Sequence, residues 1–401
     1  QLKAHLKAMG AVLIEGPKWC GKTTTAKQLA NSVISLQDTD HREEYLATAI
    51  TKPSFLLEGN VPRLIDEWQD APMLWDAVRT KVDERGLPGQ FILTGSNAID
   101  DSKIHHSGRI SRMEMLPMSL WEYGESNGSV SLMEMFDNPQ QEVFATSELS
   151  IEELIFSACR GGWPATLNLS DDKAKLLVAK EYVKSVYKND ISRIDGVKRN
   201  QKLAHMIMKS YARNISTLAK TTSILADVTA ADDVECSRPT LESYIEALEK
   251  LFVIQDIEAW CPSIRSKATI QSRPKRAFCD PSVSVASLNL SPEALMTQLK
   301  TFGFIFEQMC ARDLRVYSAS HDSHLSYYRD RYGLEADLVL HLDDGRYALI
   351  ECKLGSSEIE EGSKHLLEIK RLIQEHNKTE KQVPLREPDL MIVMTGGSMA
   401  Y

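Results

Sequence analysis

The sequence lacks any apolar run that approaches the roughly 20 residues needed to cross a bilayer, and it has no secretory signal. We therefore expect no membrane partner. Seven cysteines without a Cys-x-x-Cys pair predict reduced thiols and a cytoplasmic location. Excess positive charge is lacking too: the net charge of −9 argues against non-specific nucleic-acid binding by the whole chain. Because the first residue is Gln1, we expect the extreme N-terminus to be missing.

A glycine loop follows the first predicted strand. Residues 11–14 are a short apolar run typical of a buried strand, and residues 24–30 predict a helix. Between them lies the pattern G-x-x-x-x-G-K-[ST], whose backbone amides bind phosphate oxygens. An accidental match in a glycine turn is the alternative. The predicted nucleotide-binding residues are Gly16, Pro17, Lys18, Trp19, Cys20, Gly21, Lys22, Thr23 and Thr24.

Two adjacent carboxylates end a second apolar run, residues 63–67. Beside a phosphate loop, Asp66 would hold Mg²⁺ together with the Thr23 hydroxyl, and Lys22 would reach the outer phosphates. Glu67 would orient and deprotonate the attacking water. An acid-rich first turn of a helix is the alternative explanation of the acidic pair. The sequence thus predicts ATP and ADP as ligands and Mg²⁺ as the metal.

Residues 91–97 predict a further buried strand that ends in small polar side chains. Parallel sheets present their ligand site at the carboxyl ends of the strands. A polar residue there can touch the γ-phosphate or the attacking water. Asn97 is the first candidate for this role and Ser96 the alternative.

With these motifs the chain resembles a large group of prokaryotic AAA-type ATPases that carry a C-terminal domain of unassigned function. The resemblance rests on the glycine loop and on segments 64–69, 93–96, 108–110 and 116–122, in family order. It implies ATP hydrolysis. It also implies that Arg109 completes the site of a neighbouring subunit after self-assembly, although a surface arginine in a loop is the alternative.

Trp19 and Cys20 depart from this family, which usually has smaller or more polar residues in the loop. Because the loop contacts phosphate through backbone amides, the departure need not abolish binding. An exposed Cys20 would make the loop sensitive to oxidation.

The middle of the chain predicts a loop or linker over 127–150 and helices over 174–186 and 202–212. Short helices, a Thr-capped helix over 239–248 and a strand over 252–257 resemble a winged helix-turn-helix. A DNA-binding version would place the capped helix in the major groove. Against contact with phosphate stand Glu242, Glu246 and Glu249. In its favour stand Lys198, Arg199, Lys202, Lys209, Arg213 and Lys220. Structural or protein contact and nucleic-acid contact both stay open.

A hairpin is predicted near the C-terminus, with strands over 335–342 and 347–353. A three-residue loop places Asp337 opposite Glu351, with Lys353 on the same face by the two-residue period. A two-residue loop would place Asp337 opposite Cys352 and separate these residues.

The trio matches the signature of PD-(D/E)XK phosphodiesterases. The resemblance implies that Asp337 and Glu351 bind Mg²⁺ and that Lys353 steadies the nucleophilic water. Glu307, in a predicted helix, matches the helix carboxylate that this fold often adds to the metal site. A salt-bridged hairpin and a domain that binds without cutting are the alternatives.

We therefore expect an α/β protein. Its predicted parts are an AAA-type ATP-binding domain with a parallel sheet (1–125), a linker and helical segment (126–200), a winged-helix-like domain (201–262) and a nuclease-like α/β domain (263–401). The predicted function is ATP hydrolysis coupled to a module that binds or cleaves DNA or RNA. A non-cleaving, nucleotide-dependent switch that binds a protein or nucleic-acid partner is the alternative.

Overall fold

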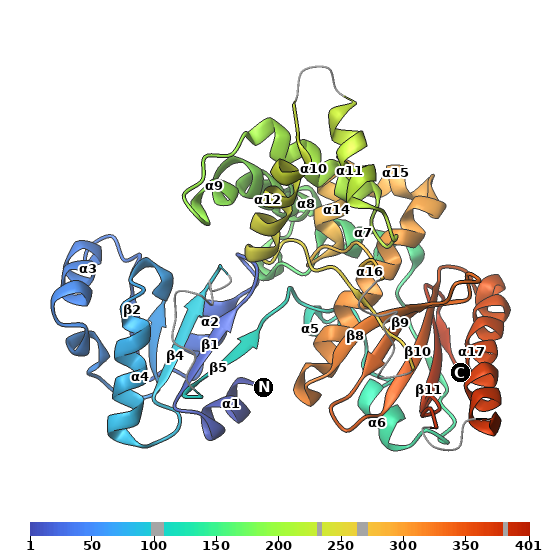
Figure 1. Ribbon diagram of the computed structural model, residues 1–401, viewed down its shortest axis with the longest axis horizontal. Helices are drawn as coiled ribbons and strands as arrows, with labels where there is room; N and C mark the ends of the chain where they lie inside the picture. The colour runs from blue at the N-terminus through green and yellow to red at the C-terminus, as the bar shows by residue number, and fades with distance from the viewer. Residues whose placement is uncertain (98–107, 231–234, 263–271, 380–383) are drawn as a thin grey trace. The chain divides into compact units, whose positions relative to one another are not determined.

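The computed structural model describes residues 1–97, 108–230, 235–262, 272–379 and 384–401. The chain divides into two compact units. The first comprises residues 1–117 with the short segments 194–196 and 246–253, and the second comprises the remainder. Figure 1 labels the elements of both units.

The first unit is built on a five-stranded parallel sheet in the order β2-β3-β4-β1-β5. Its strands are β1 (Ala11–Glu15), β2 (Ser32–Ser35), β3 (Arg63–Asp66), β4 (Phe91–Gly95) and β5 (Ile110–Glu114). Apolar runs over residues 11–14, 33–36, 63–67 and 91–97 predict four of these strands, and the structure confirms them. The edge strand β5 is an addition, because Ser111 and Arg112 interrupt its apolar character.

Helices cover both faces of this sheet, as a parallel sheet requires. They are α1 (Leu2–Ala8), α2 (Lys22–Lys27), α3 (Arg42–Thr51) and α4 (Leu74–Arg85). Alternate residues of β1 belong to separate cores because successive strand side chains point to opposite faces. Leu13 packs in the core that contains Val78 of α4, whereas Ile14 packs in the one that contains Ala26 of α2.

The middle of the chain is helical, as expected. Its helices are α5 (Leu120–Tyr123), α6 (Leu132–Asp137), α7 (Ile151–Arg160), α8 (Asp172–Ser185), α9 (Ile191–Arg193), α10 (Gln201–Arg213), α11 (Thr221–Thr229) and α12 (Arg238–Lys250). The helices predicted over 174–186 and 202–212 are confirmed by α8 and α10. In the predicted winged-helix segment, the expected strand over 252–257 is reduced to isolated bridges from Ile254 to Phe278 and from Ile257 to Lys275.

The segment 127–150, expected to be a loop or linker, contains the helix α6 and the short strand β6. Ser131 caps α6 by accepting a hydrogen bond from the Glu134 amide, and Leu132 and Phe136 are buried in the large core of the second unit. Farther along, β6 (Ala145–Thr146) pairs with β12 (Met399–Ala400). Two apolar residues at helical spacing therefore anchor a segment that is otherwise polar.

The second unit contains a mixed sheet in the order β11-β10-β9-β8-β7. Its strands are β7 (Glu258–Ala259), β8 (His324–Arg329), β9 (Glu335–His341), β10 (Tyr347–Lys353) and β11 (Leu390–Thr395). The helices that follow α12 are α14 (Pro281–Ser287), α15 (Pro292–Met296), α16 (Leu299–Ser318) and α17 (Ile359–Thr379). The hairpin strands predicted over 335–342 and 347–353 are confirmed. The sequence also predicts an amphipathic helix over 362–374 and a final buried strand over 389–394, and α17 and β11 confirm both.

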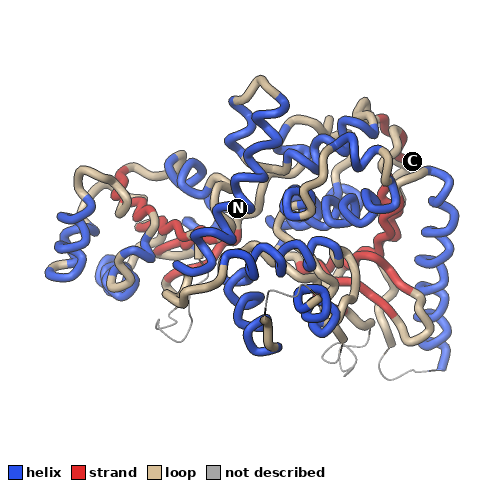
Figure 2. The backbone as a smooth tube through the Cα atoms, turned by 90° about the horizontal axis from the view of Figure 1, so that it is seen from above, coloured by secondary structure: helices blue, strands red, loops and turns tan. Residues whose placement is uncertain are grey.

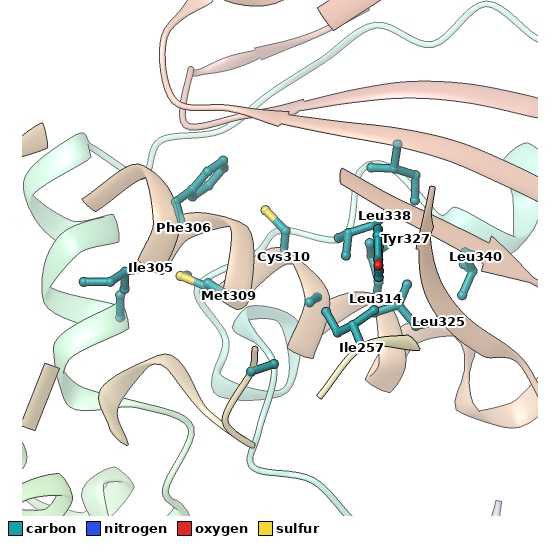
Figure 3. Close-up of a cluster of buried hydrophobic side chains, with 14 of the residues drawn as sticks. Ile257, Ile305, Phe306, Met309, Cys310, Leu314, Leu325, Tyr327, Leu338 and Leu340 are labelled. Atoms are coloured by element: carbon teal, nitrogen blue, oxygen red, sulfur yellow. The ribbon is translucent and has the colours of Figure 1, made fainter. Parts of the chain in front are cut away.

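The helices α16 and α17 cover opposite faces of this sheet, and Figures 1 and 2 show α17 running alongside its strands. Figure 3 shows the core beneath α16, where Leu314 lies near Leu338 and Tyr327. Among the described helices, none combines the length and the apolar character that a membrane span needs.

Candidate functional site

The phosphate loop joins β1 to α2 in the first unit and depends on its two glycines. Gly16 has φ +142°, and a Cβ there would lie 2.1 Å from the carbonyl oxygen of Met115. Gly21 has φ +102°, in the left-handed region that favours glycine. Both framing glycines of the sequence pattern are therefore required by the backbone.

Lys22 opens α2 and lies across the loop. It is 5% exposed, and its Nζ donates hydrogen bonds to the carbonyl oxygens of Gly16 (2.9 Å) and Pro17 (2.8 Å). Burial lowers the pKa of Lys22, and nearby Glu67 and Asp66 counteract this effect. A buried ammonium held by the loop itself is suited to an anionic ligand bound at the same loop.

Asp66 ends β3 directly beside the loop. Its Oδ1 accepts hydrogen bonds from the hydroxyls of Thr23 (2.7 Å) and Thr94 (2.6 Å). The Ser35 hydroxyl donates to Oδ2 across 3.4 Å. Thr23 and Asp66 were predicted as one magnesium pair, and the structure brings these two oxygen ligands together. Hard oxygen donors of this kind fit Mg²⁺.

Glu67 follows β3 with φ +57°, which only a minority of residues other than glycine adopt. Its amide donates to Thr94 Oγ1 across 3.2 Å. The Ser96 hydroxyl donates to its Oε1 (3.2 Å), and the Gln69 side-chain amide donates to its Oε2. Ser96 and Gln69 thus direct the carboxylate, and Thr94 holds the backbone of Glu67 at the end of β3.

The remaining predicted residues of the first unit differ in their surroundings. Ser96, the alternative to Asn97, contacts Glu67, while Asn97 itself is half-buried beside it. Cys20 is buried, so its thiol lacks the exposure on which the predicted sensitivity to oxidation depends. Arg109 pairs with Asp83, Nε to Oδ1 2.5 Å, on the surface. Of the other loop residues, Pro17 is buried, Lys18 is half-buried, and Trp19 and Thr24 are exposed.

A second acidic site lies in the sheet of the second unit. The register pairs His341 with Tyr347 and Leu338 with Ile350, and its next step brings Asp337 level with Glu351. Leu342 donates its amide to the Arg346 carbonyl (2.9 Å), and Gly345 has φ +86°. The loop therefore has three residues, and the predicted register is confirmed.

Glu351 is buried between β10 and α17. Lys353 Nζ lies 2.8 Å from its Oε2, and His365 Nδ1 lies 3.6 Å from its Oε1. Burial raises the pKa of Glu351, and the negative charge of Asp337 adds to this rise. Burial lowers the pKa of Lys353, but attraction to Glu351 outweighs it and the pKa is raised.

Glu307 and Asp337 are bridged by a lysine that the sequence did not single out. Lys275 Nζ donates to Glu307 Oε1 (2.7 Å) and to the Asp337 carbonyl oxygen (2.9 Å), and it lies 3.7 Å from Asp337 Oδ1. Asp337 Oδ2 accepts from the Cys352 amide (2.9 Å). Burial raises the pKa of Glu307 to about 7 despite the attraction of Lys275.

Magnesium does not fit this arrangement of Glu307, Asp337 and Glu351. Within the described ranges, no group of three or more His, Cys, Asp or Glu residues is placed to hold a metal ion. An ammonium already lies between two of the three predicted ligands. The four predicted side chains, Lys353 included, gather in one region, but they form ion pairs there.

Sequence reasoning missed Thr94, Gln69 and Lys275. Thr94 lies near the carboxyl end of a predicted strand, but its position beside the acidic pair depends on which strands are neighbours in the sheet. Gln69 lies two residues after Glu67, within segment 64–69, which contributes to the resemblance to AAA-type ATPases. Lys275 has no local signal, because it precedes Asp337 by 62 residues.

Three segments of the chain match families of known domains. Residues 9–124 match the family described as AAA domain. Residues 151–294 and 302–397 match two domains of unknown function, DUF8612 and DUF4143.

Among curated proteins, the chain is similar to uncharacterized proteins of Mycobacterium bovis and Mycobacterium tuberculosis. Each is 21% identical over 354 residues, which cover 86% of this chain and 71% of the relative.

Two solved structures are distantly similar. The Walker-type ATPase PABY2304 of Pyrococcus abyssi is 16% identical, with a TM-score of 0.42, covering 71% of this chain and 93% of that one. The Orc1 protein of Aeropyrum pernix, solved in complex with DNA, is 12% identical, with a TM-score of 0.23, covering 72% and 88%. Residues 9–124, which match the AAA domain family, have the parallel sheet and the glycine loop of a P-loop domain.

Proposed function

We propose that the chain hydrolyses ATP at the site formed by Lys22, Thr23, Asp66 and Glu67. The bond between Thr23 and Asp66 carries the proposal, because it joins the phosphate loop to the acidic end of β3. Glu67 follows directly, held by Ser96 and Gln69. A phosphate loop, a magnesium pair and an oriented carboxylate are the parts that phosphoryl transfer to water needs.

Each residue has a separate task in this mechanism. Thr23 and Asp66 would hold Mg²⁺, which neutralises charge on the phosphates. The loop amides and Lys22 bind phosphate oxygens and stabilise the negative charge that develops on them. Glu67 accepts the proton of the attacking water at its carboxylate, and its contacts with Ser96 and Gln69 fix the direction of approach.

Lys22→Ala tests the nucleotide site without requiring turnover. Fluorescent ATP binding to the full chain should weaken roughly ten- to hundredfold, because a charge-assisted hydrogen bond contributes about 1.5–3 kcal/mol. Lys27→Ala, at the exposed end of the same helix, is the matched control. Equal ATP affinity in wild type and Lys22→Ala would show that Lys22 does not contribute to nucleotide binding.

We further propose that Arg109 acts in a neighbouring copy of the chain, in place of its present partner Asp83. Mixing Lys22→Ala chains with Arg109→Ala chains should then restore part of the lost turnover. Each mixed pair contains one intact loop facing one intact arginine. Asp83→Ala serves as the control for the ion pair alone. Mixtures as inactive as their components would contradict action between subunits.

For the second unit we propose a nuclease-like fold that contacts DNA or RNA under control of the nucleotide cycle. The proposal is supported by the register that brings Asp337 level with Glu351 and by the proximity of Lys353. Fluorescence anisotropy with labelled single- and double-stranded DNA and RNA tests it, with ATP and ADP compared. Nucleic-acid binding that differs between ATP and ADP supports the proposal. No binding to any of the DNA or RNA probes contradicts it.

A second candidate function is a switch that binds a partner without cutting. The ammonium of Lys275 between Glu307 and Asp337 favours it, since these carboxylates were the predicted metal ligands. Incubating the same nucleic acids with Mg²⁺ or Mn²⁺ separates the two functions. Cutting that disappears in Asp337→Ala and Lys353→Ala supports a nuclease, whereas nucleotide-dependent partner binding without cutting supports the switch.

A further inference from the structure

We propose that the ammonium of Lys275 is a built-in cation that takes the place of a divalent metal at the acidic site of the second unit. The inference rests on the nuclease-like function proposed above and makes it more specific. It predicts that the site binds its partner without cutting and without a metal ion.

The contacts of Lys275 place its charge between two carboxyl-bearing residues. Its Nζ lies 2.7 Å from Glu307 Oε1, 2.9 Å from the Asp337 carbonyl oxygen and 3.7 Å from Asp337 Oδ1. These oxygens come from α16 and β9, which carry two of the three predicted metal ligands; the third, Glu351, is on β10. A metal that bridged Glu307 and Asp337 would need the space that this nitrogen fills.

The backbone holds Lys275 in this position. Its amide donates to the Ile257 carbonyl (2.8 Å) and its carbonyl accepts from the Ile257 amide (2.9 Å). The residue is 5% exposed, and its Nζ lies 5.6 Å from the centre of the Tyr327 ring. Paired on both backbone groups and buried at its tip, Lys275 is a fixed part of the site and differs from a mobile surface lysine.

The charges at the site are nearly balanced without a metal. Glu307, Asp337 and Glu351 face the ammoniums of Lys275 and Lys353. One negative charge remains, and the His365 ring lies 3.6 Å from Glu351.

Glu335, the next carboxylate on β9, pairs with Arg329 across 3.1 Å. A divalent ion added to this set would leave excess positive charge in a buried position, which is costly. The site therefore excludes a divalent ion for two reasons: the Lys275 ammonium fills the space, and the charges are already nearly balanced.

The test counts Mn²⁺ ions bound by the nucleotide-free full chain, using the electron paramagnetic resonance signal of free Mn²⁺. All proteins carry Asp66→Asn to remove the metal ligand of the first unit. The parent should show no Mn²⁺ site that depends on Asp337. Lys275→Met should gain one Mn²⁺ site per chain, and adding Asp337→Asn should abolish it. Lys364→Met, at an exposed lysine of α17, is the control and should gain no site.

Two results would overturn the proposal. One is a Mn²⁺ site in the parent that disappears on Asp337→Asn, and this result needs no variant of Lys275. The other is a folded Lys275→Met protein that gains no site. If Lys275→Met does not fold, Lys275→Gln removes the charge while keeping a hydrogen-bond donor for Glu307, and the same outcomes apply. Nucleic-acid binding is measured separately, so failure of the proposed function leaves the metal count interpretable.

Discussion

The hydroxyl of Thr94 donates a hydrogen bond to the Asp66 carboxylate across 2.6 Å at the centre of the parallel sheet. Thr94 is fully buried, and its oxygen also accepts from the Glu67 amide across 3.2 Å. One side chain of β4 therefore positions both acidic residues at the end of β3. It does so because β4 lies between β1 and β3 in the sheet.

Thr94→Val should lower ATP turnover about tenfold, the equivalent of roughly 1.4 kcal/mol in the barrier. The change keeps the shape of the side chain but leaves Asp66 without one donor and the Glu67 amide without its acceptor. Steady-state kinetics should show the loss in kcat, with ATP affinity nearly unchanged. Thr80→Val, at an exposed position of α4, should change neither. A loss confined to KM would contradict this role of Thr94.

Arg312→Met should strongly destabilise the second unit. Arg312 is buried and lies 2.9 Å from Asp280 and 2.6 Å from Asp313. Removing it leaves two buried carboxylates without this partner, and breaking such a pair costs about 3–5 kcal/mol. Chemical denaturation followed by circular dichroism measures the loss.

The matched control for Arg312 is Arg371→Met, because Arg371 pairs with Glu368 and Glu375 on the exposed side of α17. Solvent screens such pairs, so only a small change is expected. Equal effects of the two substitutions would show that burial does not govern the contribution of Arg312.

Glu307 should make the second unit less stable as the pH rises from about 5 to 8. Burial raises its pKa in the folded chain to about 7 from 4.5, so the folded state binds the proton more tightly. The stabilisation that this proton brings is complete below pH 4.5 and is lost as the pH passes 7.

Thermal denaturation of Glu307→Gln at both pH values isolates this contribution. Its unfolding midpoint should fall less between pH 5 and pH 8 than that of the wild type. Glu148→Gln, at an exposed carboxylate, should behave as the wild type does. An unchanged pH dependence in Glu307→Gln would assign the effect to other groups.

The parts predictable from sequence are those fixed by neighbouring residues. The glycine loop, the acidic end of β3 and the three-residue turn before Arg346 each depend on local chemistry. The register of Asp337 and Glu351 followed from that turn. The contact of Thr94 with Asp66 depends on which strands are neighbours, and no local pattern specifies this.

Lys275 illustrates the limit most clearly. Its role arises from a backbone pairing with Ile257 and from contacts with α16 and β9, all distant in sequence. A lysine between Pro274 and Arg276 gives no sign of such partners. The metal prediction for Glu307, Asp337 and Glu351 was made from these acids alone, without the cation that the fold places among them.

Steady-state ATP hydrolysis by the full chain, compared with that of Glu67→Gln, tests the central claim most directly. Both proteins should bind ATP, because Glu67 lies beyond the phosphate loop. With Mg²⁺ the wild type should hydrolyse ATP, and Glu67→Gln should be slower by roughly 10²–10⁴-fold through loss of the general base. Glu84→Gln, at an exposed carboxylate of α4, is the matched control. Equal turnover in wild type and Glu67→Gln, or a wild type that binds ATP without hydrolysing it at any protein concentration, would contradict the assignment.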